Sequence, residues 1–171
     1  QKRGVAMAVK SLSTRIAIIG RGAKCSGGSS AVDRSAYISR TTMYSEYDGT
    51  YYYPKYSEDL VHSEVMLPEN APEEYADPSV LWNSVEMREK NNSKAQLARS
   101  YKISIPNEWS YELATEVVRD YVKRNFVDEG MCVQFAIHDS ENPVTHRRSL
   151  HCHIMMTMRP ILPDGTWGEK Q

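Results

Sequence analysis

The chain has 171 residues, of which 40% are hydrophobic and 25% are charged, as in an ordinary single globular domain with a sizeable core. No apolar run reaches the length of a transmembrane helix and no signal-peptide pattern is present, so we expect no stable membrane insertion. Three cysteines without Cys-x-x-Cys spacing favour a reducing cytoplasm over a disulfide-stabilised secreted fold.

The net charge of −1 argues mildly against a nucleic-acid-binding protein, because such proteins are usually basic. The charges are unevenly distributed along the chain, however. Before residue 41 the only acid is Asp33, and the basic residues there are Lys2, Arg3, Lys10, Arg15, Arg21, Lys24, Arg34 and Arg40. This distribution permits a basic face on a nearly neutral protein.

The first half of the chain contains two predicted strands and one predicted helix. Residues 13–20 are rich in isoleucine and favour a strand, and a Gly/Ser-rich loop follows over 21–30. Serines at the head of residues 30–40 indicate a helix, and the tyrosine-rich stretch 44–55 favours a hairpin around an Asp-Gly pair. A second strand is expected over 62–67.

The second half adds two helices and three strands. An Asp-Pro pair precedes a helix predicted to run from about 79 to 97, and a strand follows over 102–106. A long helix over 110–126 leads into strands over 131–138 and 150–158. The order β-α-β-α-β-α-β-β predicts an α+β fold with an antiparallel sheet of about five strands and helices packed on one side.

Three histidines cluster in the pattern of the last two predicted strands. His151 and His153 stand at alternate positions and therefore project from the same face of their strand. If the two strands pair as an antiparallel hairpin, His138 joins them on that face. Three neutral imidazoles leave open positions on a metal ion, and a catalytic metal site needs open positions.

Other histidine patterns have simpler interpretations. A His-x-His pair on a strand is also common as a half-exposed polar face, and that alternative remains open on the residues alone. His62 opens an apolar run and indicates a strand-edge residue. His146 lies in a polar loop over 142–148 and is expected to be solvated.

Several motifs, each weak alone, occur in an order typical of one family. They are Ser30-Ala31-Val32 with Ser35-Ala36-Tyr37, His62 to Pro68, Leu81-Trp82-Asn83 with Val85-Glu86, Ala95 to Arg99, Ile103 with Ile105-Pro106, Phe135 to Asp139, and His151 to Pro160. Over nearly its whole length the chain resembles the MobA/MobL relaxases, plasmid-mobilisation nickases among the His-hydrophobe-His (HUH) endonucleases. Two features depart from that pattern. Ile38 and Ser39 follow the tyrosine where the family usually has a glycine or small residue, and Asn142-Pro143 lies further upstream of the histidine pair than usual.

The resemblance implies roles for individual residues. The family's nucleophile is a tyrosine in an N-terminal helix, and the match falls on Tyr37, although the chain has eleven tyrosines and Tyr44 is the alternative one heptad later. Glu86 and Glu89, three residues apart on a predicted helix, are candidates for a catalytic base or for orienting a histidine. A solvated helix face is the alternative for both glutamates.

The expected DNA contacts are basic residues near the tyrosine and beyond the histidine strand. These are Arg21, Lys24 and Arg34, together with Arg159. All-imidazole ligation by His138, His151 and His153 suits Mn²⁺, Zn²⁺, Ni²⁺ or Co²⁺ better than Mg²⁺. We expect Mn²⁺, with the other four ions as alternatives.

The implied activity is site- and strand-specific DNA nicking at a plasmid origin of transfer, through a 5′-phosphotyrosine intermediate that initiates conjugative mobilisation. The expected partners are single-stranded or supercoiled plasmid DNA, accessory relaxosome proteins and a coupling protein, in the bacterial cytoplasm. We expect one nicking domain over residues 1–171, and a start at Gln1 is compatible with an N-terminal fragment of a longer protein.

Two other functions fit the same residues. A non-catalytic DNA-binding accessory protein of transfer or replication would keep the basic N-terminal segment without needing Tyr37. A metal-dependent nuclease would use the histidines to activate water. The residues alone leave these alternatives open.

Overall fold

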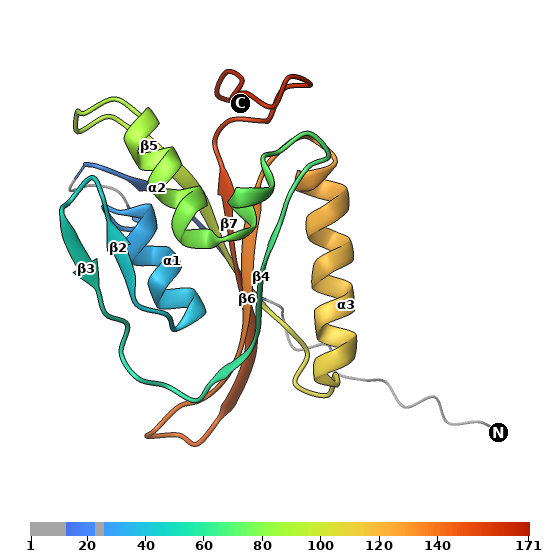
Figure 1. Ribbon diagram of the computed structural model, residues 1–171. Helices are drawn as coiled ribbons and strands as arrows, with labels where there is room; N and C mark the ends of the chain where they lie inside the picture. The colour runs from blue at the N-terminus through green and yellow to red at the C-terminus, as the bar shows by residue number, and fades with distance from the viewer. Residues whose placement is uncertain (1–12, 23–25) are drawn as a thin grey trace.

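A five-stranded sheet forms the centre of the molecule (Figure 1). The computed structural model describes residues 13–22 and 26–171. The strand order is β1-β5-β7-β6-β4, and every neighbouring pair is antiparallel. The strands are β1 (Thr14–Gly20), β4 (Leu60–Met66), β5 (Gln96–Ser104), β6 (Val133–Glu141) and β7 (Arg148–Thr157), and a separate hairpin joins β2 (Met43–Ser45) to β3 (Thr50–Tyr52). This architecture confirms the predicted α+β fold with an antiparallel sheet of about five strands.

The helices begin where side-chain caps are available. They are α1 (Ala31–Ser39), α2 (Pro78–Arg88) and α3 (Tyr111–Val122), with a 3-10 turn η1 (Glu73–Ala76) before α2 and a π-helical turn η2 (Lys123–Val127) after α3. Ser30, Asp77 and Ser110 each accept a hydrogen bond from a backbone N–H in the first turn of the helix that follows. In the part of the chain that the structure describes, no helix combines the length and apolarity needed to cross a bilayer.

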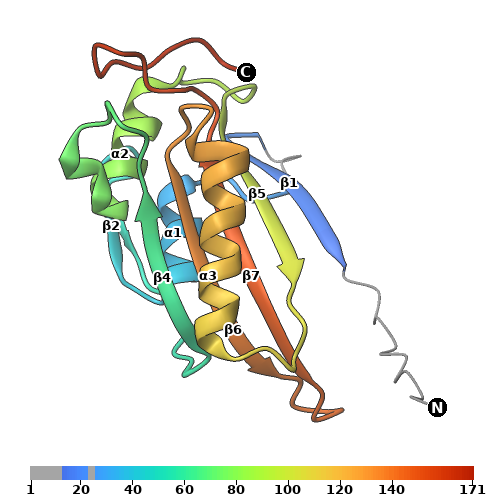
Figure 2. The same cartoon turned by 90° about the vertical axis from the view of Figure 1, so that its right-hand side faces the viewer.

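Helices cover both faces of the sheet, so the expectation that they pack on one side is wrong. Figures 1 and 2 show α3 on one face and α1 with α2 on the other. The strands explain this arrangement, because β6 carries apolar side chains on both of its faces. Ile137 belongs to the core under α3, whereas Ala136 belongs to the core under α1 and α2. Both faces must therefore be covered.

The boundary between α2 and β5 also differs from the prediction. Helix α2 ends at Arg88 instead of about residue 97, and β5 begins at Gln96 instead of residue 102. The guanidinium of Arg21 donates to backbone carbonyls in and just beyond the last turn of α2, which terminates the helix there. Buried Ala98 then pairs with Ile19 of β1, so this segment contributes to the core as a strand.

Candidate active site

The hairpin of β6 and β7 brings the three predicted histidines together. His138 lies directly opposite His151, and His153 lies opposite Ala136, on the face that carries α1. The ring centroids of the three imidazoles are 4.7 to 5.4 Å apart. One potential ligand atom from each residue falls within a group no wider than 4.8 Å. The strand alternation read from the sequence therefore places all three imidazoles in one cluster.

Burial determines the charge of this cluster. The exposed fractions of His138, His151 and His153 are 1%, 5% and 3%. Loss of hydration, followed by the neighbouring histidines and other nearby charges, lowers the pKa of His151 to about 4 and that of His153 to about 2. Burial also lowers the pKa of His138. All three rings are therefore neutral near pH 7, which is the form that binds metal.

The hydrogen bonds of the rings leave one nitrogen on each for a ligand. His138 donates from Nε2 to the carbonyl of Ile38 at 2.7 Å, and His151 donates from Nδ1 to the carbonyl of Ser149 at 2.9 Å. Such bonds fix the tautomer and the orientation of a metal-binding ring. The Nδ1 atom of His153 is buried and has no hydrogen-bond partner among the described residues. Since an unsatisfied buried nitrogen is costly, this donor set fits a divalent metal ion of the kind that imidazole binds.

Tyr37 of α1 lies beside the histidines. Its ring is 6.2 Å from the His153 ring in an edge-to-face arrangement, and 40% of the side chain is exposed. The guanidinium carbons of Arg34 and Arg40 lie 4.9 and 4.7 Å from the centre of its ring. Tyr44, the alternative nucleophile, packs on Tyr51 in the β2–β3 hairpin. The structure thus brings Tyr37 to the cluster by direct ring contact.

A paired arginine and aspartate hold the end of α1 against this site. Arg40, in the left-handed conformation after the last turn, donates to Asp59 at 3.0 and 2.9 Å and to the carbonyl of Tyr37 at 3.0 Å. Asp59 lies 3.9 Å from Nδ1 of His138. Burial raises the pKa of Asp59, but bonds from Arg40 and Ser57 and nearby positive charge outweigh it and lower the pKa to about 2. Asp59 is therefore a carboxylate near pH 7, and it links the tyrosine helix to the histidine strand.

Glu86 occupies a different place from the one predicted for a catalytic base. Its Oε1 atom accepts hydrogen bonds from the Ser30 hydroxyl at 2.8 Å and from the backbone N–H groups of Ala31 at 2.6 Å and Val32 at 3.2 Å. Tyr37 lies six residues further along α1 than Ala31, or about 9 Å at 1.5 Å per residue. Burial raises the pKa of Glu86 despite these bonds. The carboxylate anchors the positive N-terminal end of α1 and makes no bond to a histidine among the described residues.

Glu89 and Arg159, the other two predicted groups on this side, neutralise each other. The Arg159 Nε atom lies 2.8 Å from a Glu89 oxygen, and Lys170 lies 2.9 Å from the second Glu89 oxygen. Arg159 also donates to the carbonyl of Gly168. These contacts tie the end of α2 to the C-terminal segment. The expected roles of Glu89 as an alternative catalytic base and of Arg159 as a phosphate contact would require these contacts to break, and both stay predictions.

Of the predicted DNA contacts that the structure describes, only Arg34 faces the site without a salt bridge. Arg21 caps the end of α2 and lies over the Tyr47 ring at 3.8 Å, so its guanidinium is engaged. Lys24 lies outside the described residues. Arg34 forms no salt bridge within 13–22 and 26–171, and its charge contributes to the low pKa of His153 after burial and the other two histidines.

The remaining histidines lie apart from this cluster. His62 is inside the edge strand β4, where its ring packs 5.7 Å from Phe135 on the α3 face. His146 is exposed in the β6–β7 loop and lies 2.9 Å from Glu141. The sequence reasoning missed Asp59 and Arg40, because no local motif marks a pair whose partners are joined only by the fold.

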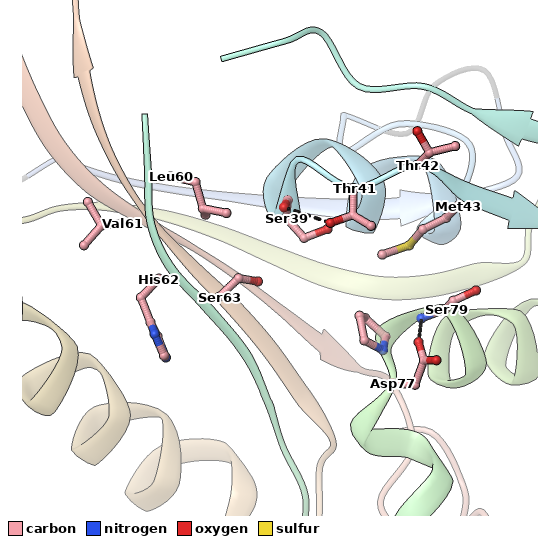
Figure 3. Close-up of a pocket in the computed structure, with 11 residues that line it drawn as sticks. Ser39, Thr41, Thr42, Met43, Leu60, Val61, His62, Ser63, Asp77 and Ser79 are labelled. Atoms are coloured by element: carbon pink, nitrogen blue, oxygen red, sulfur yellow. Dashed lines mark hydrogen bonds between the residues drawn. The ribbon is translucent and has the colours of Figure 1, made fainter. Parts of the chain in front are cut away.

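A separate cavity of about 710 Å³ opens between β4, the loop after α1 and the start of α2. Figure 3 shows Leu60 to Ser63 of β4 on one side of it and Asp77 with Ser79 on another. Neither Tyr37 nor any of the three clustered histidines lines this cavity. It is therefore distinct from the tyrosine and histidine site.

Comparison with known proteins identifies relatives of this arrangement. The family model described as the MobA/MobL family matches residues 29–171. A "Conjugal transfer protein TraA" of Agrobacterium fabrum is 38% identical over 122 residues, which are 65% of this chain and 10% of that protein. A "Probable mobilization protein MobA" of Bifidobacterium longum is 31% identical over 146 residues, which are 83% of this chain and 24% of that protein. The chain therefore spans a quarter or less of the length of these two relatives.

A solved structure has the same fold. It comes from work on the "Molecular Basis of Vancomycin Resistance Transfer in Staphylococcus aureus", superimposes with a TM-score of 0.79 at 22% sequence identity, and covers 94% of this chain and 76% of its own. At that identity the likeness concerns the fold. The family match extends over the tyrosine helix and the histidine hairpin as well, and on that ground this chain belongs to the MobA/MobL family.

Proposed function

We propose that this chain cuts one strand of plasmid DNA at an origin of transfer and becomes joined to the new 5′ end through Tyr37. The observation that carries the proposal is the contact between the Tyr37 ring and His153, at 6.2 Å, beside a buried cluster of three neutral imidazoles. Family membership and the relatives named for mobilisation and conjugal transfer support a role in conjugative DNA processing.

The reaction is a transesterification that needs no added reactant. The Tyr37 oxygen forms a bond to phosphorus, and the bond between phosphorus and the 3′ oxygen breaks. Overall, the proton of the phenol ends on the 3′ hydroxyl. The phosphodiester energy is kept in the phosphotyrosine bond, so the same site can rejoin the strand.

The surrounding residues orient the reacting groups. His138, His151 and His153 would hold a divalent ion, with Mn²⁺ as the expected ion and Zn²⁺, Ni²⁺, Co²⁺ or Mg²⁺ as alternatives. When bound, the ion would supply a Lewis acid for the non-bridging oxygens of the scissile phosphate. Arg34 places positive charge beside the Tyr37 ring, where it would attract the phosphate, while Arg40 is held in its ion pair with Asp59.

The biological setting is part of the same proposal. The substrate would be single-stranded or supercoiled plasmid DNA in the bacterial cytoplasm, and accessory relaxosome proteins and a coupling protein would present the origin and receive the product. A relative in Salmonella typhimurium, 32% identical over 137 residues, is named a "43 kDa relaxation protein". That name fits an activity that releases supercoils by nicking.

A denaturing gel separates this function from its alternatives. The protein is incubated with single-stranded origin DNA and Mn²⁺, and the products are resolved after denaturation. We expect a covalent protein–DNA adduct with the native chain, no adduct with Tyr37→Phe, and an undiminished adduct with the matched control Tyr44→Phe. Cleaved DNA with free ends would instead indicate a nuclease that activates water. Bound but uncut DNA would indicate a non-catalytic binding protein.

A further inference from the structure

A row of paired residues crosses the sheet on the face that carries the histidines. From the β4 edge to the β1 edge, the backbone register aligns Ser63, Ala136, His153, Lys102 and Arg15. Directly paired residues of antiparallel strands project to the same face. With neighbouring strands about 4.8 Å apart, Lys102 stands roughly 5 Å and Arg15 roughly 10 Å from His153 along this row.

On the two sides of the site, toward β4 and toward β1, helices cover the sheet face to different extents. Toward β4, helix α1 packs on β6 and β4. Around Arg15 and Lys102 the face is more open, and Figure 2 shows α1 and α2 gathered behind β4 and β6, away from the lower parts of β1 and β5. Only the Ile19 end of β1 belongs to the core under α1 and α2. The exposed side chains of Arg15 and Lys102 agree with this view. A DNA strand that leaves the Tyr37 site therefore has open space on the β1 side of the sheet face.

The two directions also differ in charge. Ser63, at the β4 end of the row, lines the cavity of Figure 3 together with the Asp77 carboxylate, and none of the residues that line it is Lys or Arg. At the β1 end, Lys102 and Arg15 are both cationic and have no salt bridge with any described residue. The negatively charged backbone of DNA is therefore repelled on the Asp77 side and attracted on the side of Lys102 and Arg15.

On the same face, small side chains lie next to Lys102 and Arg15 and leave room for a DNA backbone to pass. They are Ser13 and Ser104.

We infer that Lys102 and Arg15 form a phosphate-binding track that carries single-stranded DNA from the Tyr37 site across β5 and over the β1 edge. Contacts to phosphates position a strand without reading its sequence. The inference rests on the proposed function, because the track leads to the site where the strand is cut. Unlike Arg21 and Arg159, which are bonded to other protein groups, these two residues have no salt bridge to a described residue.

The test measures binding of a poly-dT oligonucleotide by fluorescence anisotropy over a range of salt concentrations. The variants are Lys102→Gln, Arg15→Gln and the double change, in a Tyr37→Phe background that cannot react. Lys94→Gln is the matched control, since Lys94 is exposed, has no salt bridge to a described residue and lies in the loop before the opposite end of β5. Thermal unfolding of each variant confirms that it is folded.

We expect each single change to weaken binding about 5-fold near 0.1 M salt and to reduce the slope of log affinity against log salt by about 0.7. The double change should weaken binding about 25-fold on the same basis, and the control should leave it unaltered. Unchanged binding in the double variant would overturn the track. An equal loss in the control would also overturn it, because the effect would then reflect net charge alone.

The same variants separate the track from the proposed function. If Lys102→Gln weakens binding as expected while the Tyr37 protein forms no adduct, the track stands and the nicking proposal fails. If the Tyr37 protein forms the adduct and neither substitution alters binding, the nicking proposal stands and the track is wrong.

Discussion

The two faces of the central sheet have opposite characters, although the same strands build both. On β6, Ile137 faces α3 and the adjacent His138 faces α1, and on β7 Ile154 and His153 divide in the same way. The face under α3 is an apolar core, whereas the other face combines an apolar core with the histidine cluster. A slip of one residue in register would exchange the two sets, so the packing of α3 also fixes where the histidines point.

The helices on the two faces are held by different forces. Helix α3 packs through buried apolar side chains such as Val118 and Val122. Helix α1 has in addition a set of directed polar contacts. Glu86 holds its first turn, Gln134 accepts from Ser35 at 2.6 Å, and the carbonyl of Ile38 accepts from His138. Directed bonds fix position more narrowly than apolar contact does, and position is what a nucleophile requires.

The largest expected effect comes from a substitution in the histidine cluster. We expect His151→Ala to lower the nicking rate by more than about 100-fold and to weaken metal binding sharply, because one of three ligands is lost. Calorimetric titration with Mn²⁺ and the denaturing gel measure the two effects. The matched control is His146→Ala in the exposed loop, which should change neither. Metal binding that survives His151→Ala unchanged would show that these histidines are not the ligands.

The apolar face should respond in the opposite way. Phe135 is fully buried under α3, and we expect Phe135→Ala to lower the free energy of unfolding by about 3–5 kcal/mol through lost burial and a residual cavity. Urea denaturation measures this change. The folded fraction should still bind metal, since Phe135 projects away from the histidines. A specific loss of metal affinity without a loss of stability would contradict the division of the sheet.

Lowering the pH should destabilise the metal-free protein through the buried histidines of one face. The pKa values of His151 and His153 are lowered in the folded state to about 4 and about 2, so below the ordinary value near 6.5 the unfolded chain binds protons that the folded chain excludes. The metal-free protein should therefore lose up to about 1.4 kcal/mol per pH unit for each of these residues as pH falls from about 6.5 toward 4. Urea midpoints measured across this range check the slope.

A neutral replacement provides the control for that slope. His153→Gln removes one titrating group, so its loss of stability below pH 6.5 should be shallower than that of the native chain. An identical slope in both proteins would show that His153 is not protonated on unfolding in the way its burial requires.

The smallest expected effect concerns Glu86. We expect Glu86→Gln to keep nicking within about 10-fold of the native rate, because an amide oxygen can still accept bonds at the start of α1. Loss of a catalytic base would cost about 10²–10⁴-fold. Single-turnover nicking rates distinguish the two. A fall in the larger range, with unfolding unchanged, would restore the catalytic role that the sequence suggested.

Local patterns predicted much of this molecule. Alternation in β7 and the hairpin pairing with β6 were enough to place His138, His151 and His153 on one face. Side-chain caps and an Asp-Pro pair located the starts of the helices. The resemblance to a family, and not the residue pattern, singled out Tyr37 among eleven tyrosines.

What escaped prediction depends on partners distant in the chain. The end of α2 is set by Arg21, and the direction of Glu86 by the start of α1, so neither follows from helical spacing. The pairing of Arg159 with Glu89 likewise requires the fold to bring them together. We did not predict helices on both faces of the sheet, because the apolar pattern of a strand does not show which helix covers each of its faces.

The most direct test of the central claim is to identify the residue that carries the DNA. After reaction of the native protein with origin DNA and Mn²⁺, nuclease and protease digestion leaves a nucleotide-linked peptide that mass spectrometry can sequence. The account predicts that the added mass lies on Tyr37, next to the histidines. A mass on Tyr44 or another residue, or cleaved DNA with no linked peptide, would contradict it.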